Sequence, residues 1–126
     1  MKAYLHNYKQ APRKVRLVAN LIKGKSVTSA QLELKHLAKR AALPMEKLLD
    51  SAVANAKVAG ASIENLMVKN VTVNKGLVMK RMMPRAFGRG APIHKHMSHV
   101  ELTLAETVAK VKKARTIKSK KSKADK

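Results

Sequence analysis

Apolar side chains recur with a helical period near the start of the chain. Pro12 suits the first position of a helix and Gly24 suits its end, so a helix is predicted between them. A short mixed segment over residues 2–10 precedes this helix and is predicted as an edge strand. The apolar positions of the helix, three and four residues apart, are Val15, Val18, Ala19 and Ile22.

Two more helices are predicted before the pattern changes. Thr28 with Gln31 matches a capping box, and Val27 with Leu32 matches a hydrophobic staple, so the second helix is predicted to begin at Thr28. Pro44 is predicted to start the third helix. The apolar face of the second helix is Ala30, Leu34, Leu37, Ala38 and Ala41, and that of the third is Met45, Leu48, Leu49, Ala52, Val53 and Ala56.

Beyond residue 65 the apolar positions alternate with the period of a strand. Leu66 and Val68 form one alternating pair, and Val71 and Val73 form the next pair, one residue out of phase. This slip predicts a bulge or two short strands. The Asn-Lys-Gly run over 74–76 is typical of a turn, so a turn is predicted there.

A long hairpin is predicted over about residues 77–105. Its strands cover 77–83 and 93–105, and they flank a loop over 84–92 that is rich in Gly and Pro. The predicted fold class is therefore α+β, with three helices packed on one face of a small antiparallel sheet and the hairpin protruding from it.

The composition indicates one folded domain with a strongly basic surface. The chain has 126 residues and is 45% hydrophobic, which is enough for a core, so a single domain is predicted over 1–110. The Lys- and Ser-rich tail over 111–126 is predicted to be disordered on its own. Lys and Arg number 28 against 7 Asp and Glu, a net charge of +21. A polyanion relieves the self-repulsion of such a chain, so nucleic acid is the first candidate partner and an anionic membrane surface the second.

The charge is distributed unevenly along the chain. Residues 33–64 hold four of the seven acids, whereas residues 65–100 hold none against seven Lys and Arg. The middle segment is therefore predicted to face solvent and the rest to meet a polyanion. In the hairpin, like charges face each other and no second hydrophobic layer is expected, so it should be ordered only where something negative encloses it. Compact RNA can enclose such a finger on all sides, whereas a duplex or a lipid surface does not.

The residues present exclude several kinds of chemistry. The chain has no cysteine, and its longest apolar run is three residues, whereas a membrane span needs about 20. His94 and His96 would share one face of a strand and His99 the other, so no metal site is expected. Paired carboxylates are absent, so neither an enzyme nor a cofactor is predicted. The aromatic residues are two Tyr and one Phe, so base stacking on a sheet of aromatics is not expected.

Three blocks, in order along the chain, resemble a single family. They are Pro12–Ala19, Pro44–Ala56, and the hairpin signature Lys80–Gly90 with Ile93–Val100. A lone Pro-Arg-Ala-x-Gly-Arg run would be a weak signal, whereas three colinear blocks with this charge pattern are specific. Together they resemble the family of ribosomal protein twenty-two of the large subunit, over about residues 4–107.

The resemblance implies a structural protein that binds large-subunit ribosomal RNA, supports assembly of the subunit and performs no catalysis. The globular part would lie near the mouth of the polypeptide exit tunnel, and the hairpin would cross RNA of several domains. Its tip would form part of the tunnel wall beside ribosomal protein four and would meet the nascent polypeptide. A cytoplasmic ribosome is the expected location, with an organelle-encoded copy left open. Neither a membrane partner nor a homo-oligomer is expected.

The tip departs from the family pattern at several positions. Phe87 stands where Lys or Arg is common, Ala91-Pro92 replaces a more polar pair, and His94 and His96 stand where basic residues are usual. These departures leave the tip contacts open. The ring of Phe87 could stack on a base or face the tunnel lumen.

Two sets of site residues are predicted. Arginine can hold a phosphate through two hydrogen bonds and stack on a base, and glycine lets RNA approach the backbone closely. The predicted RNA-binding residues are Lys9, Arg13, Lys14, Arg16, Lys80, Arg81, Arg85, Gly88, Arg89, His94, Lys95, His96, Ser98 and His99. The residues that the resemblance places at the tunnel-lining tip are Met82, Met83, Phe87, Arg89, Gly90 and Ala91.

The alternative function is that of a nonspecific, nucleoid-type DNA-binding protein. Such a protein would share the charge of this chain but would prefer a duplex. A cationic membrane-active protein would need a Lys-rich amphipathic helix with bulky apolar side chains opposite, and the first predicted helix is too short for that role.

Overall fold

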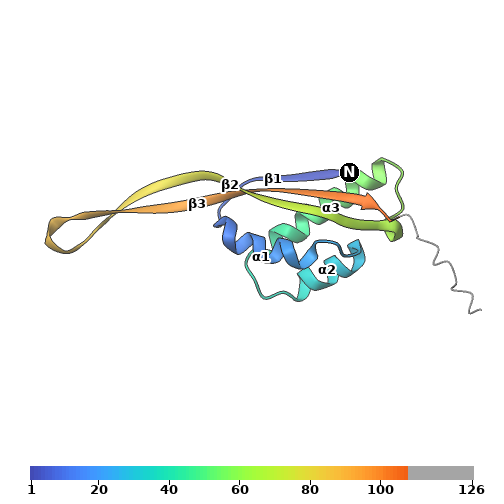
Figure 1. The fold of residues 1–126 in the computed structure, drawn as a ribbon, viewed down its shortest axis with the longest axis horizontal. Helices are drawn as coiled ribbons and strands as arrows, with labels where there is room; N and C mark the ends of the chain where they lie inside the picture. Colours follow the sequence, from blue (N-terminus) through green and yellow to red (C-terminus); the bar gives the residue numbers. More distant parts are fainter. Residues whose placement is uncertain (108–126) are drawn as a thin grey trace, which may run out of the picture.

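A computed structural model describes residues 1–107, in which three helices cover one face of a three-stranded sheet and a two-stranded arm extends beyond them (Figure 1). The predicted α+β class is thereby confirmed. The predicted tail over 111–126 lies outside the described residues. The elements are β1 (Lys2–Tyr8), α1 (Pro12–Ile22), α2 (Val27–His36), α3 (Ala42–Val58), the 3-10 turn η1 (Ile63–Asn65), β2 (Leu66–Pro84), the 3-10 turn η2 (Ala86–Gly88) and β3 (Gly90–Glu106).

The core lies between the helical layer and the sheet. The apolar stripes predicted for the first and third helices are confirmed, because every member of both is buried. Helix α1 begins at Pro12 and ends before Gly24, as predicted. The largest side chains that are almost fully buried come from all three helices and from β2 and β3, and they include Ile22, Leu34, Met45, Leu49, Leu66 and Leu102.

The sheet is antiparallel, with the strand order β1-β3-β2. Strand β1 pairs only with β3, so the prediction of an edge strand near the start of the chain is confirmed. The outer edge of β2 is partly covered by the link between α1 and α2. There the Gly24 N–H donates to the Val68 carbonyl at 2.8 Å, and the Val68 N–H donates to the Lys25 carbonyl at 2.9 Å.

The start predicted for the second helix is wrong. Ser26, not Thr28, is the N-cap, and its hydroxyl accepts a hydrogen bond from the Ser29 N–H at 3.4 Å. Leu32 is 60% exposed, so the predicted staple with Val27 is also wrong. Two residues with capping hydroxyls stand close together here, and the one that precedes the buried Val27 forms the cap.

The end predicted for the second helix and the start predicted for the third are displaced as well. Leu37 adopts an extended conformation at the C-cap of α2, so Leu37 and Ala38 lie outside the helix. This connection brings Ala41 into the core. Helix α3 then begins at Ala42, and Pro44 occupies its first turn, where the missing N–H removes no helical hydrogen bond.

The turn predicted over 74–76 is a bulge within one continuous strand. Lys75 pairs with Ser98 and Val78 pairs with His96, so two residues of β2 stand opposite one residue of β3. Gly76 suits this bulge because packing is tight there: a Cβ atom would lie 3.1 Å from His99 Nε2 and 3.3 Å from the Met97 carbonyl carbon. The bulge predicted from the phase slip between 68 and 71 is confirmed as a register shift between Val68 and Asn70.

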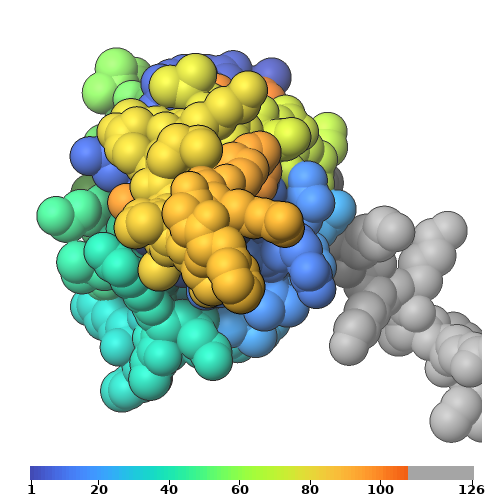
Figure 2. Space-filling model, turned by 90° about the vertical axis from the view of Figure 1, so that its left-hand side faces the viewer, coloured from blue at the N-terminus to red at the C-terminus, as the bar shows by residue number. Residues whose placement is uncertain are grey.

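We call residues 79–95 the arm. Strand β1 stops pairing with β3 at Ser98, so beyond that point β2 and β3 pair only with each other. No residue of the arm is buried, and residues 80–90 are all exposed. The strands stay paired as far as Pro84 and Gly90, so the loop predicted over 84–92 is shorter than expected and the hairpin begins well before residue 77. Figure 2 views the molecule from the tip, with the yellow and orange arm in front of the body.

Candidate nucleic-acid interface

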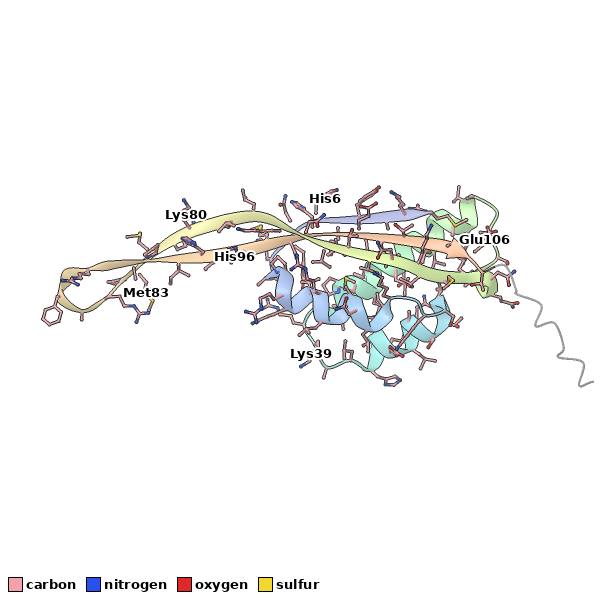
Figure 3. The ribbon with its side chains drawn as sticks, in the orientation of Figure 1. His6, Lys39, Lys80, Met83, His96 and Glu106 are labelled. Carbon is pink, nitrogen blue, oxygen red and sulfur yellow. The ribbon has the colours of Figure 1, made fainter. Side chains whose placement is uncertain are left out.

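The arm carries cations on both of its faces. Lys80 pairs across the strands with His94, whereas Arg81 pairs with Ile93 and Met79 pairs with Lys95. Successive side chains of a strand point to opposite faces, so Lys80 and His94 share one face and Arg81 and Lys95 share the other. Figure 3 shows Lys80 and Met83 along the arm, clear of the helices. A ligand that neutralised all of these cations would have to surround the arm.

Two acidic side chains are paired with lysines within the body. Two ion pairs occur within residues 1–107, one between Lys25 and Glu33 and one between Lys2 Nζ and Glu101 Oε1 at 2.9 Å. The hydrogen bond between Lys2 and Glu101 raises the pKa of the lysine and lowers the pKa of the carboxyl. Residues 65–100 contain no acid, so the arm has no carboxylate of its own to pair with.

The tip displays its side chains through an unusual backbone. The Arg85 N–H donates to the Arg89 carbonyl at 2.7 Å and closes the loop. Phe87 and Gly88 both adopt left-handed conformations, with φ of 59° and 66°. A phenylalanine in this conformation costs about 1–2 kcal/mol, and its ring is 97% exposed. The other predicted tip residues are also exposed, apart from the half-buried Ala91.

Arg16 has a structural role that the sequence did not reveal. Its Nε and Nη2 atoms donate to the Val73 carbonyl at 3.1 and 2.9 Å, which joins α1 to β2. Arg13, one turn earlier on the same helix, is exposed like Arg16 but makes no such hydrogen bond within residues 1–107. The two arginines were predicted to share one role, but the structure gives them different surroundings.

We expect Arg16→Ala to lower the free energy of unfolding by about 1–2 kcal/mol, because it removes two hydrogen bonds and leaves the Val73 carbonyl without them. The matched control is Arg13→Ala, which should change the stability by less than about 0.5 kcal/mol. Thermal unfolding of both variants measures the difference. Equal losses would show that the Arg16 contact does not stabilise the protein.

A basic hollow lies where the arm meets the body. Its volume is about 500 Å³. It brings together four of the predicted RNA-binding residues from three separate segments, and Figure 3 shows one of them, His96, where the arm leaves the body. The hollow is lined by Lys9, Gln10, Ala11, Lys14, Arg40, Met79, Lys95, His96 and Met97.

Arg40 is the residue of this hollow that sequence reasoning missed. It lies in the acid-bearing segment over 33–64, which was predicted to face solvent, yet it stands beside three lysines. Its position is fixed because Tyr8 Oη donates to the Arg40 carbonyl at 3.2 Å and Ala41 is buried next to it. The available signal was that Arg40 directly precedes two small apolar residues, Ala41 and Ala42, and both of these are buried in the structure. Burial raises the pKa of Tyr8, and its hydroxyl, which is protonated at neutral pH in any case, can donate this hydrogen bond.

Ser98 and His99 lie apart from the other predicted site residues. Ser98 is fully buried, which removes it from any surface contact in this conformation. His99 is half-buried, and its Nδ1 accepts a hydrogen bond from the Asn7 N–H at 3.2 Å. Its ring meets that of His6 edge-on, with centroids 5.4 Å apart, and His6 in turn stacks on Tyr4. His94 and His96 instead form their own edge-on pair at 6.3 Å, which confirms that the strand separates them from His99.

Neither a cluster of metal-binding side chains nor a membrane-spanning helix is found among the described residues. Within 1–107, no group of three or more His, Cys, Asp or Glu side chains could hold a metal ion. None of the helices in this part of the chain is long and apolar enough to cross a membrane.

Comparison with known proteins assigns this arrangement to a family. The family described as ribosomal protein L22p/L17e matches residues 3–105, which include the whole sheet-and-helix body up to Ala105 and the complete arm. The chain belongs to this family. It is therefore a structural protein of the large ribosomal subunit, located in the cytoplasm as part of the ribosome, and not an enzyme.

Individual members of the L22p/L17e family match over most of their length. The large ribosomal subunit protein uL22 of Myxococcus xanthus is 46% identical over 107 residues, covering 82% of this chain and 94% of that protein. The uL22 of Mesoplasma florum is 46% identical over 106 residues, covering 83% and 95%. The uL22 of Acholeplasma laidlawii is 47% identical over 97 residues, covering 76% and 87%.

Proposed function

We propose that the chain binds ribosomal RNA of the large subunit through its arm and the adjoining surface of α1. The observation that carries this proposal is the arm itself, whose seventeen positions over 79–95 include no buried residue and no acid. An isolated two-stranded ribbon is only marginally stable in water, and cations on both faces repel each other. Enclosing phosphates would remove both penalties, and they would release condensed counterions as they do so.

The tip supports the second part of the proposal, that the arm ends at the wall of the polypeptide exit tunnel. Met82 is 72% exposed and pairs with Pro92 near the end of the arm, and Phe87 is 97% exposed in the tip turn itself. Apolar side chains held in solvent on a cationic arm suit a surface that meets bases, a neighbouring ribosomal protein such as protein four, and the passing nascent polypeptide.

An arm that gains its order from RNA also links the chain to subunit assembly. Because such an arm would bind only when the RNA segments around it are close together, it would hold those segments in place. The body, with its own core, would remain folded before and after this step.

The test is a comparison of affinity for two nucleic acids at several salt concentrations. We expect the chain to bind a folded large-subunit RNA fragment at least about tenfold more tightly than duplex DNA at physiological salt, because a smooth duplex cannot surround the arm. The chain should also co-sediment with large subunits. Equal binding of both nucleic acids, without co-sedimentation, would contradict the proposal and favour a nonspecific DNA-binding protein.

A further inference from the structure

The hollow at the root of the arm combines two kinds of surface. Lys9, Lys14, Arg40 and Lys95 provide four cations at its rim. Its apolar lining comes from two methionines and one alanine, and Met97 is among the buried residues. A site for phosphate alone would need only the cations, and a site for a hydrocarbon would need only the apolar lining.

None of the residues that line this hollow is acidic, so its four cations are not neutralised by a neighbour within it. Ala11 lies at the amino end of α1, where the helix has no side-chain cap and carries partial positive charge. These features favour an anionic ligand at the rim. A volume of about 500 Å³ accommodates one small organic group as well.

Gln10 lines the hollow and contains a polar atom whose hydrogen bonding is unsatisfied. Its Oε1 atom is buried and has no hydrogen-bond partner within residues 1–107. A carboxamide both donates and accepts hydrogen bonds, and so it can pair with the edge of a nucleobase. A buried oxygen without a partner is costly, so a rotation of this side chain toward a ligand in the hollow would relieve that cost.

We propose that this hollow, lined by Lys9, Gln10, Lys14, Arg40, Met79 and Lys95, holds one unpaired nucleotide turned out of an RNA helix. The base lies against Met79 and Met97, and its flanking phosphates lie against the cations of the rim. Polarizable methionine side chains adapt to a flat ring, and unstacked bases are the parts of RNA that proteins read most readily. This inference rests on the proposed function, since it takes RNA as the ligand.

The position of the hollow fits this role. Its lining comes from the residues that follow β1, the start of α1, the connection before α3 and the root of the arm. In Figure 2, which looks along the arm from its tip, blue α1 lies to one side and the blue-green segment between α2 and α3 lies below. A nucleotide held there would fix where the arm enters the RNA relative to the body.

The experiment uses the full chain and three short RNA hairpins. One carries a single unpaired adenosine, the second is fully paired, and the third has an abasic nucleotide at the unpaired position. We expect the adenosine hairpin to bind about tenfold more tightly than the other two, because only it buries a base in the hollow. Equal binding of the adenosine and abasic hairpins would overturn the proposal, because the phosphates would then account for the affinity.

Met79→Trp fills the hollow without changing the charge, so it should remove the preference for the adenosine hairpin and leave the salt dependence unaltered. The matched control is Leu77→Trp, which adds the same ring at a 60% exposed position outside the hollow and should keep the preference. A Met79→Trp chain that still prefers the unpaired adenosine would overturn the proposal.

Crosslinking on the unsubstituted chain gives a second readout. With 4-thiouridine at the unpaired position, the crosslinked peptide should contain residues 9–11, 40, 79 or 95–97. Crosslinks confined to the tip or to the outer helices would contradict the proposal. Failure of the unsubstituted chain to co-sediment with large subunits would instead refute the proposed function, whatever the affinities for the three RNA hairpins.

Discussion

Replacement of residues 80–94 by an Asn-Gly turn should yield a folded body that no longer enters large ribosomal subunits. Met79 and Lys95 pair directly across the two strands, so a two-residue turn can join them without disturbing the register below. No residue from 79 to 95 is buried, so the core loses nothing. The replaced segment carries Lys80, Arg81, Arg85 and Arg89, which are four of the charges proposed to meet phosphate.

The expected loss of affinity for large-subunit RNA is at least about hundredfold, because hydrogen bonds to charged groups are worth about 1.5–3 kcal/mol each. The melting temperature of the shortened chain should lie within about 4 °C of that of the intact chain, since a shift of that size corresponds to a change of less than about 1 kcal/mol in the free energy of unfolding. Sedimentation of tagged chains with large subunits gives the third measurement. A shortened chain that still enters subunits at the normal level would refute the central role of the arm.

The second large effect is expected from Arg85→Ala combined with Arg89→Ala. The backbone bond between these two residues holds them side by side at the base of the tip loop. Each guanidinium can grip a phosphate through two hydrogen bonds, which alanine cannot replace. Affinity for the large-subunit RNA fragment should fall by about tenfold to hundredfold, and the slope of log affinity against log salt should decrease by about 1.4–1.8.

The matched control removes two charges elsewhere on the described surface. Lys35 on α2 and Lys57 on α3 are exposed, and both lie outside the arm and the hollow. Lys35→Ala with Lys57→Ala lowers the net charge by the same amount and should reduce affinity by less than about threefold, the effect of long-range charge alone. Equal losses in the two double variants would mean that the arm acts only through bulk electrostatics.

The sequence predicted those parts of the fold that depend on local periodicity. The stripes of α1 and α3 were readable because burial on one face of a helix imposes spacings of three and four residues. The predictions failed where two local signals compete. Ser26 and Thr28 are both good N-caps, and Asn74 to Gly76 suits a turn, but tertiary packing decided each case.

The candidate site was predictable on the arm and much less so on the body. An acid-free run of cations in a ribbon is visible in the sequence, whereas the hollow is assembled from four segments that meet only in the fold. Arg40 was missed for that reason. Ser98 was included because its polarity suggests exposure, yet it is fully buried, and Arg16 is exposed but donates to the Val73 carbonyl.

The lack of burial in the arm determines what solution thermodynamics can report about this protein. The dependence of unfolding on urea and the heat-capacity change of unfolding both scale with the surface that becomes exposed. Because residues 79–95 contribute no fully buried side chain, both quantities come mainly from the body. A urea titration of the isolated protein therefore reports mainly on the body, whereas the heat-capacity change of complex formation would register the surface that the arm buries against its partner.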